Sequence, residues 1–124
     1  MKRIIPFLIF LGIFIVLGIG LHFLRGKNSS QDLKGIVLFY GIGCPHCAKV
    51  EAFIKENKIK EKIAFEEKEV YFNRENAKQL VEVAKKCGFN EKEIGVPFLW
   101  DGEGQRCIVG DEPIINFFKE KLNL

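Results

Sequence analysis

The residues of this chain best suited to chemistry are two cysteines and a histidine in the stretch Cys44–Cys47, which reads Cys-Pro-His-Cys. Two thiols at this spacing can exchange disulfides, supply half of a metal site or form a small structural disulfide. A structural disulfide that closes a loop of only four residues would stabilise the fold little. We therefore expect this pair of thiols to be chemically active.

A metal site would need further ligands, and the two remaining cysteines, Cys87 and Cys107, are the candidates for a set of four thiolates. Zinc ribbons bring their second pair as another Cys-x-x-Cys, whereas these two cysteines lie 20 residues apart. We therefore expect no metal and no other cofactor. A Cu- or Zn-binding module stays as the non-enzymatic alternative.

The segments on either side of the Cys44–Cys47 pair predict a turn between a strand and a helix. Residues 36–40 form a continuous apolar run that ends at Gly41, which is typical of a strand buried on both faces. Residues from Pro45 to about Asn57 carry apolar side chains at helical spacing. Pro45 suits the first position of this helix, where its missing N–H group is no loss.

A cysteine at the N-terminus of a helix is chemically special, because free backbone N–H groups and the positive end of the helix dipole favour its thiolate. Cys44 occupies that place, and we expect His46 to stabilise its charged sulfur further. A stabilised thiolate stabilises the reduced form of the cysteine pair, so its disulfide is readily transferred to the thiols of another protein. Cys47 lies one turn further into the helix, which suits the thiol that resolves a mixed disulfide.

The rest of the chain predicts an α/β domain with the element order β-α-β-α-β-β-α. A parallel first pair of strands and an antiparallel hairpin then give a four-stranded mixed sheet with helices on both faces. The second strand is the more polar one and is expected near a sheet edge. The remaining elements are a strand over 63–71, a helix from an Asn73 cap to about Cys87, strands over 96–100 and 105–109, and a last helix capped by Asp111.

The roles of Cys87 and Cys107 stay open at this level. Cys87 falls on the apolar stripe of its predicted helix, where a free thiol packs as a small hydrophobic group. Cys107 lies in the middle of the last strand and can point at that helix. Two inert buried thiols, a structural disulfide and a second redox relay are therefore all considered.

Three motifs resemble the thioredoxin/glutaredoxin superfamily, and the resemblance covers residues 34–124. They are Phe-Tyr-Gly-Ile-Gly-Cys-Pro-His-Cys at 39–47, Val96-Pro97, and Val-Gly-Asp at 109–111 before the last helix. The compact size is similar to that of glutaredoxins, which usually have Tyr in place of His46. The Cys-Pro-His-Cys tetrapeptide itself resembles that of the periplasmic disulfide oxidases of the DsbA kind, which are strongly oxidising.

This resemblance implies a fold and a set of site residues. The fold would be thioredoxin-like, with Cys44 as the nucleophile, Cys47 as the resolving thiol and Pro97 as a cis-proline that faces them. The main chain of Val96 would pair with an extended substrate, which is a form of strand addition. Substrate binding would involve Pro45, Val96 and Pro97. The glutathione contacts of the family find only a partial match in Gly110-Asp111.

The N-terminal segment predicts a membrane anchor. Residues 4–24 contain no Asp, Glu, Lys or Arg, and about 20 apolar residues suffice to cross a bilayer as a helix. A cleaved signal peptide, whose apolar stretch is roughly 7 to 15 residues, and a buried core helix are the alternatives. We expect an uncleaved anchor over 1–27, a linker over 28–34 and the folded domain over 35–124.

The charge of the chain gives no reason to expect nucleic-acid binding. The chain has 19 Lys and Arg against 16 Asp and Glu, a formal net charge of +3. Four of the cations, Lys2, Arg3, Arg25 and Lys27, flank the apolar run, so the other 15 face 16 acidic residues and form no basic stripe. The charged runs at 58–62 and 66–69 are expected to be solvated surface.

Together these features predict a single-pass membrane protein that acts as a thiol–disulfide oxidoreductase. Its clients would be proteins with thiols or disulfides, and the tetrapeptide favours oxidation of these clients. A membrane-bound, quinone-linked thiol oxidase would recharge the cysteine pair. The charges that flank the anchor barely distinguish its two orientations, so the cysteine chemistry is the main reason to place the domain outside the cytoplasm. A glutaredoxin-like reductase is the enzymatic alternative.

Overall fold

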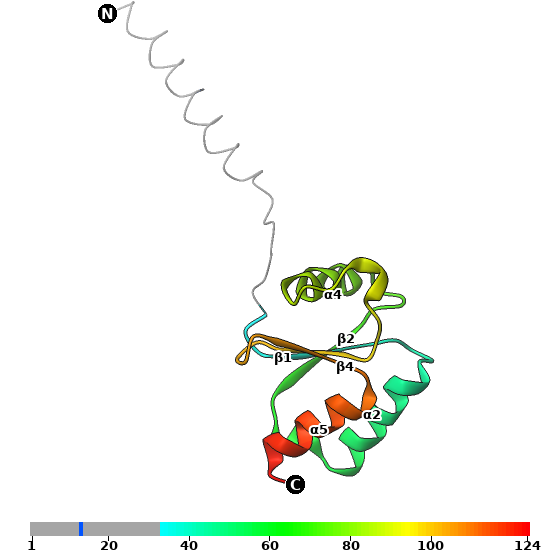
Figure 1. Cartoon of the computed structure of the whole chain (residues 1–124), viewed down its shortest axis with the longest axis vertical. Helices are drawn as coiled ribbons and strands as arrows, with labels where there is room; N and C mark the ends of the chain where they lie inside the picture. Colours follow the sequence, from blue (N-terminus) through cyan, green and yellow to red (C-terminus); the bar gives the residue numbers. More distant parts are fainter. Residues whose placement is uncertain (1–12, 14–32) are drawn as a thin grey trace, which may run out of the picture. The chain divides into compact units, whose positions relative to one another are not determined.

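The computed structural model describes residue 13 and residues 33–124 (Figure 1). The predicted anchor over 1–27 and most of the predicted linker therefore lie outside the residues described. The elements of the described domain are β1 (Ile36–Tyr40), α2 (Pro45–Glu56), α3 (Ile59–Lys62), β2 (Phe65–Glu69), α4 (Arg74–Lys86), the 3-10 turn η1 (Glu91–Glu93), β3 (Phe98–Asp101), β4 (Arg106–Val109) and α5 (Asp111–Leu122).

The four strands form one mixed sheet in the order β2-β1-β3-β4. Strand β1 pairs in parallel with β2 and antiparallel with β3, and β3 pairs antiparallel with β4. Helix α4 covers one face of the sheet, whereas α2 and α5 cover the other (Figure 1). The predicted α/β class, mixed sheet and helices on both faces are thereby confirmed, and β2 is an edge strand as expected.

Strand β1 is central because its side chains enter two different apolar layers. Ile36 and Leu38 pack with residues of α2 and α5, and Val37 and Phe39 pack with residues of α4. All four side chains are buried. A strand with both faces covered has no polar positions, which explains the continuous apolar run in the sequence. The turn that carries Cys44 therefore follows a strand that is packed on both faces.

Two expectations for the middle of the chain were wrong in detail. The second strand covers Phe65–Glu69 rather than 63–71, and the charged run at 58–62 is not all surface, because a short helix, α3, buries Ile59 completely. The charged residues around Ile59 led to the prediction of solvated surface, but its apolar side chain packs with residues of α2 and α5. Alternation alone does not mark where a strand on a sheet edge stops pairing.

The expected cap of the last helix was also wrong. Helix α5 begins at Asp111, and its N-cap is Gly110, whose φ is +97° and which makes no side-chain cap hydrogen bond. Glycine adopts such an angle at little cost, because it has no Cβ. The carboxylate of Asp111 is thereby left to contact α2.

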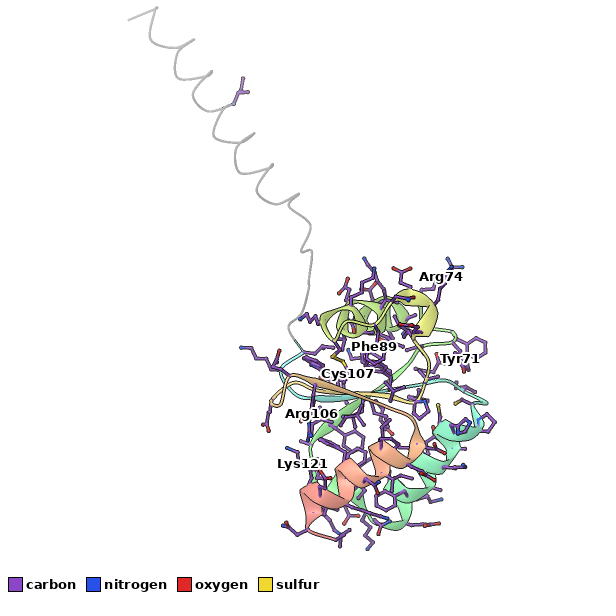
Figure 2. The ribbon with its side chains drawn as sticks, in the orientation of Figure 1. Tyr71, Arg74, Phe89, Arg106, Cys107 and Lys121 are labelled. Atoms are coloured by element: carbon purple, nitrogen blue, oxygen red, sulfur yellow. A yellow bond between two sulfur atoms is a disulfide. The ribbon has the colours of Figure 1, made fainter. Side chains whose placement is uncertain are left out.

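Cys87 and Cys107 form a disulfide with a Cα–Cα distance of 6.2 Å. Cys87 is the C-cap of α4, and Cys107 lies in the edge strand β4 (Figure 2). Of the three interpretations that the sequence left open, the structure therefore contains the bridge. It ties the helix on one face to the edge of the sheet.

None of the helices in residues 33–124 combines the length and the apolar character that a membrane span requires.

Candidate active site

The two cysteines of the tetrapeptide lie where β1 turns into α2. Cys44 is the N-cap of α2, and its Sγ accepts a hydrogen bond from the backbone N–H of Cys47 at 3.2 Å. Pro45 follows at the first helical position, and Gly43 has a φ of +83°. Glycine is favoured at that angle, so the sequence Gly-Cys-Pro directs the sulfur of Cys44 onto the free N–H groups of the helix.

The two thiols are free and differ in their environment. Cys44 is 7% exposed and Cys47 is 2% exposed. Burial, together with a hydrogen bond to Cys44, raises the pKa of the Cys47 thiol to about 12. Cys47 therefore stays protonated at neutral pH, while the N-terminus of α2 favours negative charge on the sulfur at its cap. The geometry suits Cys44 as nucleophile and Cys47 as resolving thiol.

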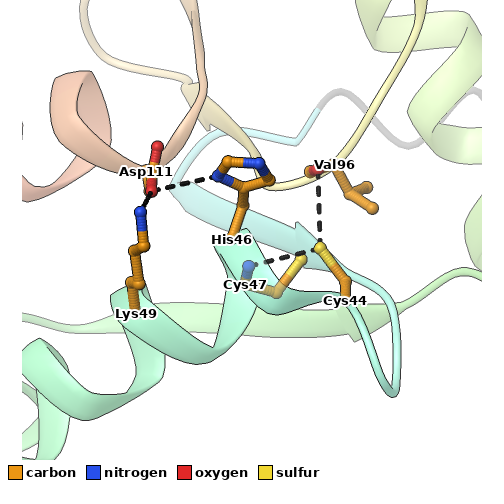
Figure 3. A network of polar contacts seen from close by, with 6 residues as sticks. All are labelled: Cys44, His46, Cys47, Lys49, Val96 and Asp111. Atoms are coloured by element: carbon orange, nitrogen blue, oxygen red, sulfur yellow. Dashed lines mark hydrogen bonds and ion pairs between the residues drawn. The ribbon is translucent and has the colours of Figure 1, made fainter.

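Val96 and Pro97 lie opposite Cys44. The peptide bond between them is cis, as the resemblance implied. Cys44 Sγ donates a hydrogen bond to the carbonyl oxygen of Val96 at 3.7 Å (Figure 3). Strand β3, which begins at Phe98, pairs with β1, and this pairing brings the two segments together across 52 residues of sequence. Three of the expected site positions, Cys44, Val96 and Pro97, thus meet.

His46 makes a contact that the sequence analysis did not predict, and its expected effect on the Cys44 sulfur stays a prediction. Its Nδ1 lies 3.1 Å from Oδ2 of Asp111, and Nζ of Lys49 lies 2.9 Å from the same oxygen (Figure 3). The Lys49 ammonium and then the His46 imidazole hold the pKa of Asp111 well below its usual range. This contact forms because the side chain of residue 46 projects from α2 toward the start of α5, where Asp111 lies (Figure 3). His46 is a link between two helices in this structure.

Glu69, the last residue of β2, was missed by the sequence analysis. Its carboxylate accepts hydrogen bonds from the backbone N–H groups of Tyr71 at 2.8 Å, Phe72 at 2.9 Å, Asn73 at 3.2 Å and Ile42 at 3.4 Å. Burial raises the pKa of Glu69, but these four bonds outweigh it and hold the pKa below the ordinary value. Glu69 therefore ties the loop after β2 to the turn that carries Cys44.

A signal for this neighbourhood does exist in the sequence. Parallel neighbouring strands end at the same edge of a sheet, and ligand-binding residues gather outside those ends. Once β1 and β2 are paired in parallel, the residues that follow β2 must lie beside those that follow β1. Tyr40 and Glu69 are indeed register partners. A search along this edge would have singled out Glu69 and Tyr71.

The surface near Cys44 is hollowed along the turn and the first helical residues. This hollow has a volume of about 270 Å³ and is lined by Gly41, Ile42, Gly43, Cys44, Pro45, Ala48 and Glu51. A larger hollow of about 500 Å³ lies between α2, α3 and β2 and includes neither cysteine. Of these two hollows, the smaller one is the one lined by a cysteine.

A set of four thiolates does not form. Cys87 and Cys107 are bonded to each other, so they offer no thiolate to a metal at Cys44 and Cys47. Within the described residues, no three side chains of His, Cys, Asp or Glu gather in a way that could hold a metal ion.

Comparison with known proteins found no family model that matches this chain and no curated protein that matches its sequence.

Proposed function

We propose that residues 33–124 form a thioredoxin-like domain that exchanges disulfides with client proteins through Cys44 and Cys47. One observation carries this proposal: Cys44 caps α2 with its sulfur opposite the cis Val96–Pro97 bond, and the buried Cys47 lies one turn behind it. A thiolate at a helix N-terminus with a second thiol beside it is the arrangement that disulfide exchange requires.

The favoured direction is oxidation of the client. A client thiolate attacks Sγ of Cys44 in the Cys44–Cys47 disulfide, the bond between the two cysteines breaks, and Cys47 leaves and takes a proton. A second client thiolate then attacks the client sulfur of the mixed disulfide, and Cys44 leaves as a thiolate. The client gains a disulfide, and the pair Cys44–Cys47 gains the two electrons. A quinone-linked membrane thiol oxidase would remove these electrons again.

Exposed apolar side chains near the site support a protein client. Ile42 is 62% exposed, Tyr71 57% and Phe72 79%. The carboxylate of Glu69 binds the backbone N–H groups of all three, so they belong to one surface beside Cys44. Exposed apolar patches with a polar rim mark sites of protein interaction. A small thiol such as glutathione would leave this surface uncovered.

The location of the domain outside the cytoplasm is part of the proposal, and so is the anchor over residues 4–24. The Cys87–Cys107 disulfide supports this location, because structural disulfides persist in oxidising compartments and are rare in the cytosol. A tether in the membrane would keep the domain near a membrane-bound oxidase.

Reduction of clients is the second candidate direction. The contact between His46 and Asp111 favours it, because the negative carboxylate offsets any positive charge that His46 presents to the sulfur of Cys44. The direction depends on the reduction potential of the pair relative to its partners, and about 30 mV corresponds to a tenfold change in the equilibrium constant.

The test is to equilibrate the full-length protein in detergent with glutathione redox buffers and to measure oxidation of a reduced dithiol peptide. We expect a potential above that of thioredoxin, which is about −270 mV, and loss of exchange in Cys44→Ser. A potential below that value would reverse the direction. Exchange that survives in Cys44→Ser would overturn the function itself.

A further inference from the structure

Tyr71 lies against the turn that carries Cys44. A Cβ atom built on Gly41 would come within 2.4 Å of Cε2 and Cζ of the Tyr71 ring. The ring therefore rests directly on the backbone of Gly41, and only a residue without a side chain leaves room for it. Cζ is the atom that bears the hydroxyl group, so the hydroxyl end of the ring, and not only its edge, is at the turn. Figure 2 shows Tyr71 at the end of the domain where α2 begins.

The backbone on both sides of this contact is fixed by one carboxylate. Glu69 accepts a hydrogen bond from Tyr71 N–H at 2.8 Å and from Ile42 N–H at 3.4 Å. Cys44 N–H in turn donates to the carbonyl oxygen of Gly41 at 3.1 Å. The loop that carries Tyr71 and the turn that carries Cys44 are therefore joined through Glu69.

The electrostatics of the ring agree with this position. Desolvation raises the pKa of Tyr71, and the nearby sulfur of Cys44 raises it further, because negative charge there disfavours a second negative charge on the phenol oxygen. The hydroxyl group therefore keeps its proton at neutral pH and is available as a donor. The outer side of the ring remains in solvent, since Tyr71 is 57% exposed.

We propose that the hydroxyl group of Tyr71 donates a hydrogen bond to the sulfur of Cys44 and is a catalytic residue of the disulfide exchange. This inference rests on the proposed function. The hydroxyl stabilises the Cys44 thiolate, both when it attacks and when it leaves a mixed disulfide. The proton stays on the tyrosine oxygen throughout, so the exchange needs no additional acid or base. Tyr71 thereby acts on the sulfur from the loop after β2, whereas His46 contacts Asp111 at the start of α5.

The decisive variant is Tyr71→Phe, which keeps the ring on Gly41 and removes only the hydroxyl group. The matched control is Tyr40→Phe, the same chemical change at the only other tyrosine of the chain. Both are made in the full-length protein with Cys47→Ser, so that Cys44 is the single free thiol. The rate of alkylation by iodoacetamide is measured from pH 4 to pH 10.

We expect the midpoint of the alkylation profile to rise by about one pH unit in Tyr71→Phe, which means about tenfold less thiolate at a pH below both midpoints. Tyr40→Phe should leave the midpoint unchanged. With Cys47 restored, the potential of the pair should fall by about 30 mV in Tyr71→Phe at a pH above both midpoints, the equivalent of that tenfold change. A midpoint that does not move in Tyr71→Phe would overturn the proposal.

A second variant guards against a purely structural effect. Gly41→Ala must push the ring aside, because the new Cβ would lie 2.4 Å from it. We expect the midpoint to rise as in Tyr71→Phe, and the double variant to show no further rise, since the hydroxyl can be lost only once. Additive shifts would contradict the inference. Loss of client exchange in Cys44→Ser is a separate result that tests the proposed function, whatever Tyr71 does.

Discussion

At the scale of single residues, the two thiols of the site are distinguished by position rather than by type. Cys44 caps a helix and faces the Val96 carbonyl, whereas Cys47 is buried one turn later with a pKa raised to about 12. The burial that keeps Cys47 protonated also protects it from external reagents. In the proposed exchange, Cys47 would be the internal thiol that resolves a mixed disulfide at Cys44.

Asp111 offers a test of the link between α2 and α5 through its pH dependence. The neighbouring Lys49 and His46 lower its pKa in the folded state from an ordinary 3.8. A carboxylate whose pKa is lower in the folded state than in the unfolded state stabilises the fold at pH values above its unfolded-state pKa. This contribution disappears as the pH falls through the folded-state pKa. We expect Asp111→Asn to lower the melting temperature at pH 7 and pH 5, and the difference from wild type to shrink below pH 4.

Glu112→Gln is the control for this measurement, because it removes a carboxylate from the same helical turn and leaves Asp111 in place. Thermal melts followed by circular dichroism from pH 7 to pH 3 compare the three proteins. A difference between wild type and Asp111→Asn that grows between pH 4 and pH 3 would contradict the ion pairs.

Residue roles were predicted to different extents. Cys44 and Cys47 lie in one contiguous stretch between an apolar run and a helical pattern, so their place at a strand-to-helix turn could be predicted from the sequence. The partner of His46 could not be predicted, because Asp111 lies 65 residues further along the chain and only the packing of α5 on α2 brings the two side chains together. Glu69 lay in a charged run that was interpreted as surface.

At the scale of elements, α2 and α4 begin with different caps. Helix α2 uses a thiol, and α4 uses the side chain of Asn73, which accepts hydrogen bonds from the N–H groups of Glu75 and Asn76 at 3.1 Å each. The Asn73 N–H also donates to Glu69. The start of α4 is thereby attached to the loop that holds Tyr71.

The Asn73 cap predicts a loss of stability on truncation. Asn73→Ala removes the acceptor for two helix N–H groups and should lower the free energy of unfolding by about 1 kcal/mol. Urea unfolding followed by circular dichroism measures this. Asn116→Ala is the matched control, since Asn116 is exposed in the interior of α5 and alanine is favoured there. Equal effects of the two substitutions would show that the cap contributes nothing.

The ends of helices and strands were predictable where a glycine or a tight turn marks them in the sequence. The predicted end of α4 at about Cys87 is close to the observed one, where Gly88 follows with a φ of +85°, and the hairpin turns between Asp101 and Arg106. Strand β2 was extended too far in the prediction, since pairing with a single neighbour ends where Glu69 turns to the loop. Helix α3 was missed because its one buried residue, Ile59, gives no periodic signal.

At the scale of the whole domain, the sheet order brings the segments of the candidate site to one edge. Strands β1 and β2 run in parallel and end together, and β3 starts on the other side of the end of β1. The turn of Cys44 therefore lies between the loop of Tyr71 and the Val96–Pro97 segment. The disulfide lies on the α4 face and leaves this edge free.

The Cys87–Cys107 bridge should stabilise the domain without taking part in exchange. It closes a loop with a sequence separation of 20, and a loop of that size is worth about 3 kcal/mol. We expect the free energy of unfolding of the variant with both residues changed to Ser, measured by urea titration, to be lower by this amount. At low temperature and without urea, the variant should still exchange disulfides through Cys44.

Two results would contradict this view of the bridge. Unchanged stability of the double Ser variant would show that the bridge does not constrain the unfolded chain. Loss of exchange in a variant that circular dichroism shows to be folded would mean that Cys87 and Cys107 relay electrons.

The sequence by itself determined the features that a contiguous stretch of chain can encode: the central apolar strand, the amphipathic helices, the hairpin, and two thiols at the mouth of a helix. Only the tertiary structure decided that Cys87 bonds Cys107, that His46 meets Asp111, and that Glu69 and Tyr71 hold the turn of Cys44. The reason is physical. Local patterns reflect burial and backbone preferences of neighbouring residues. These contacts instead join segments that are far apart in the sequence and that come together only when the strands pair in the order of the folded sheet.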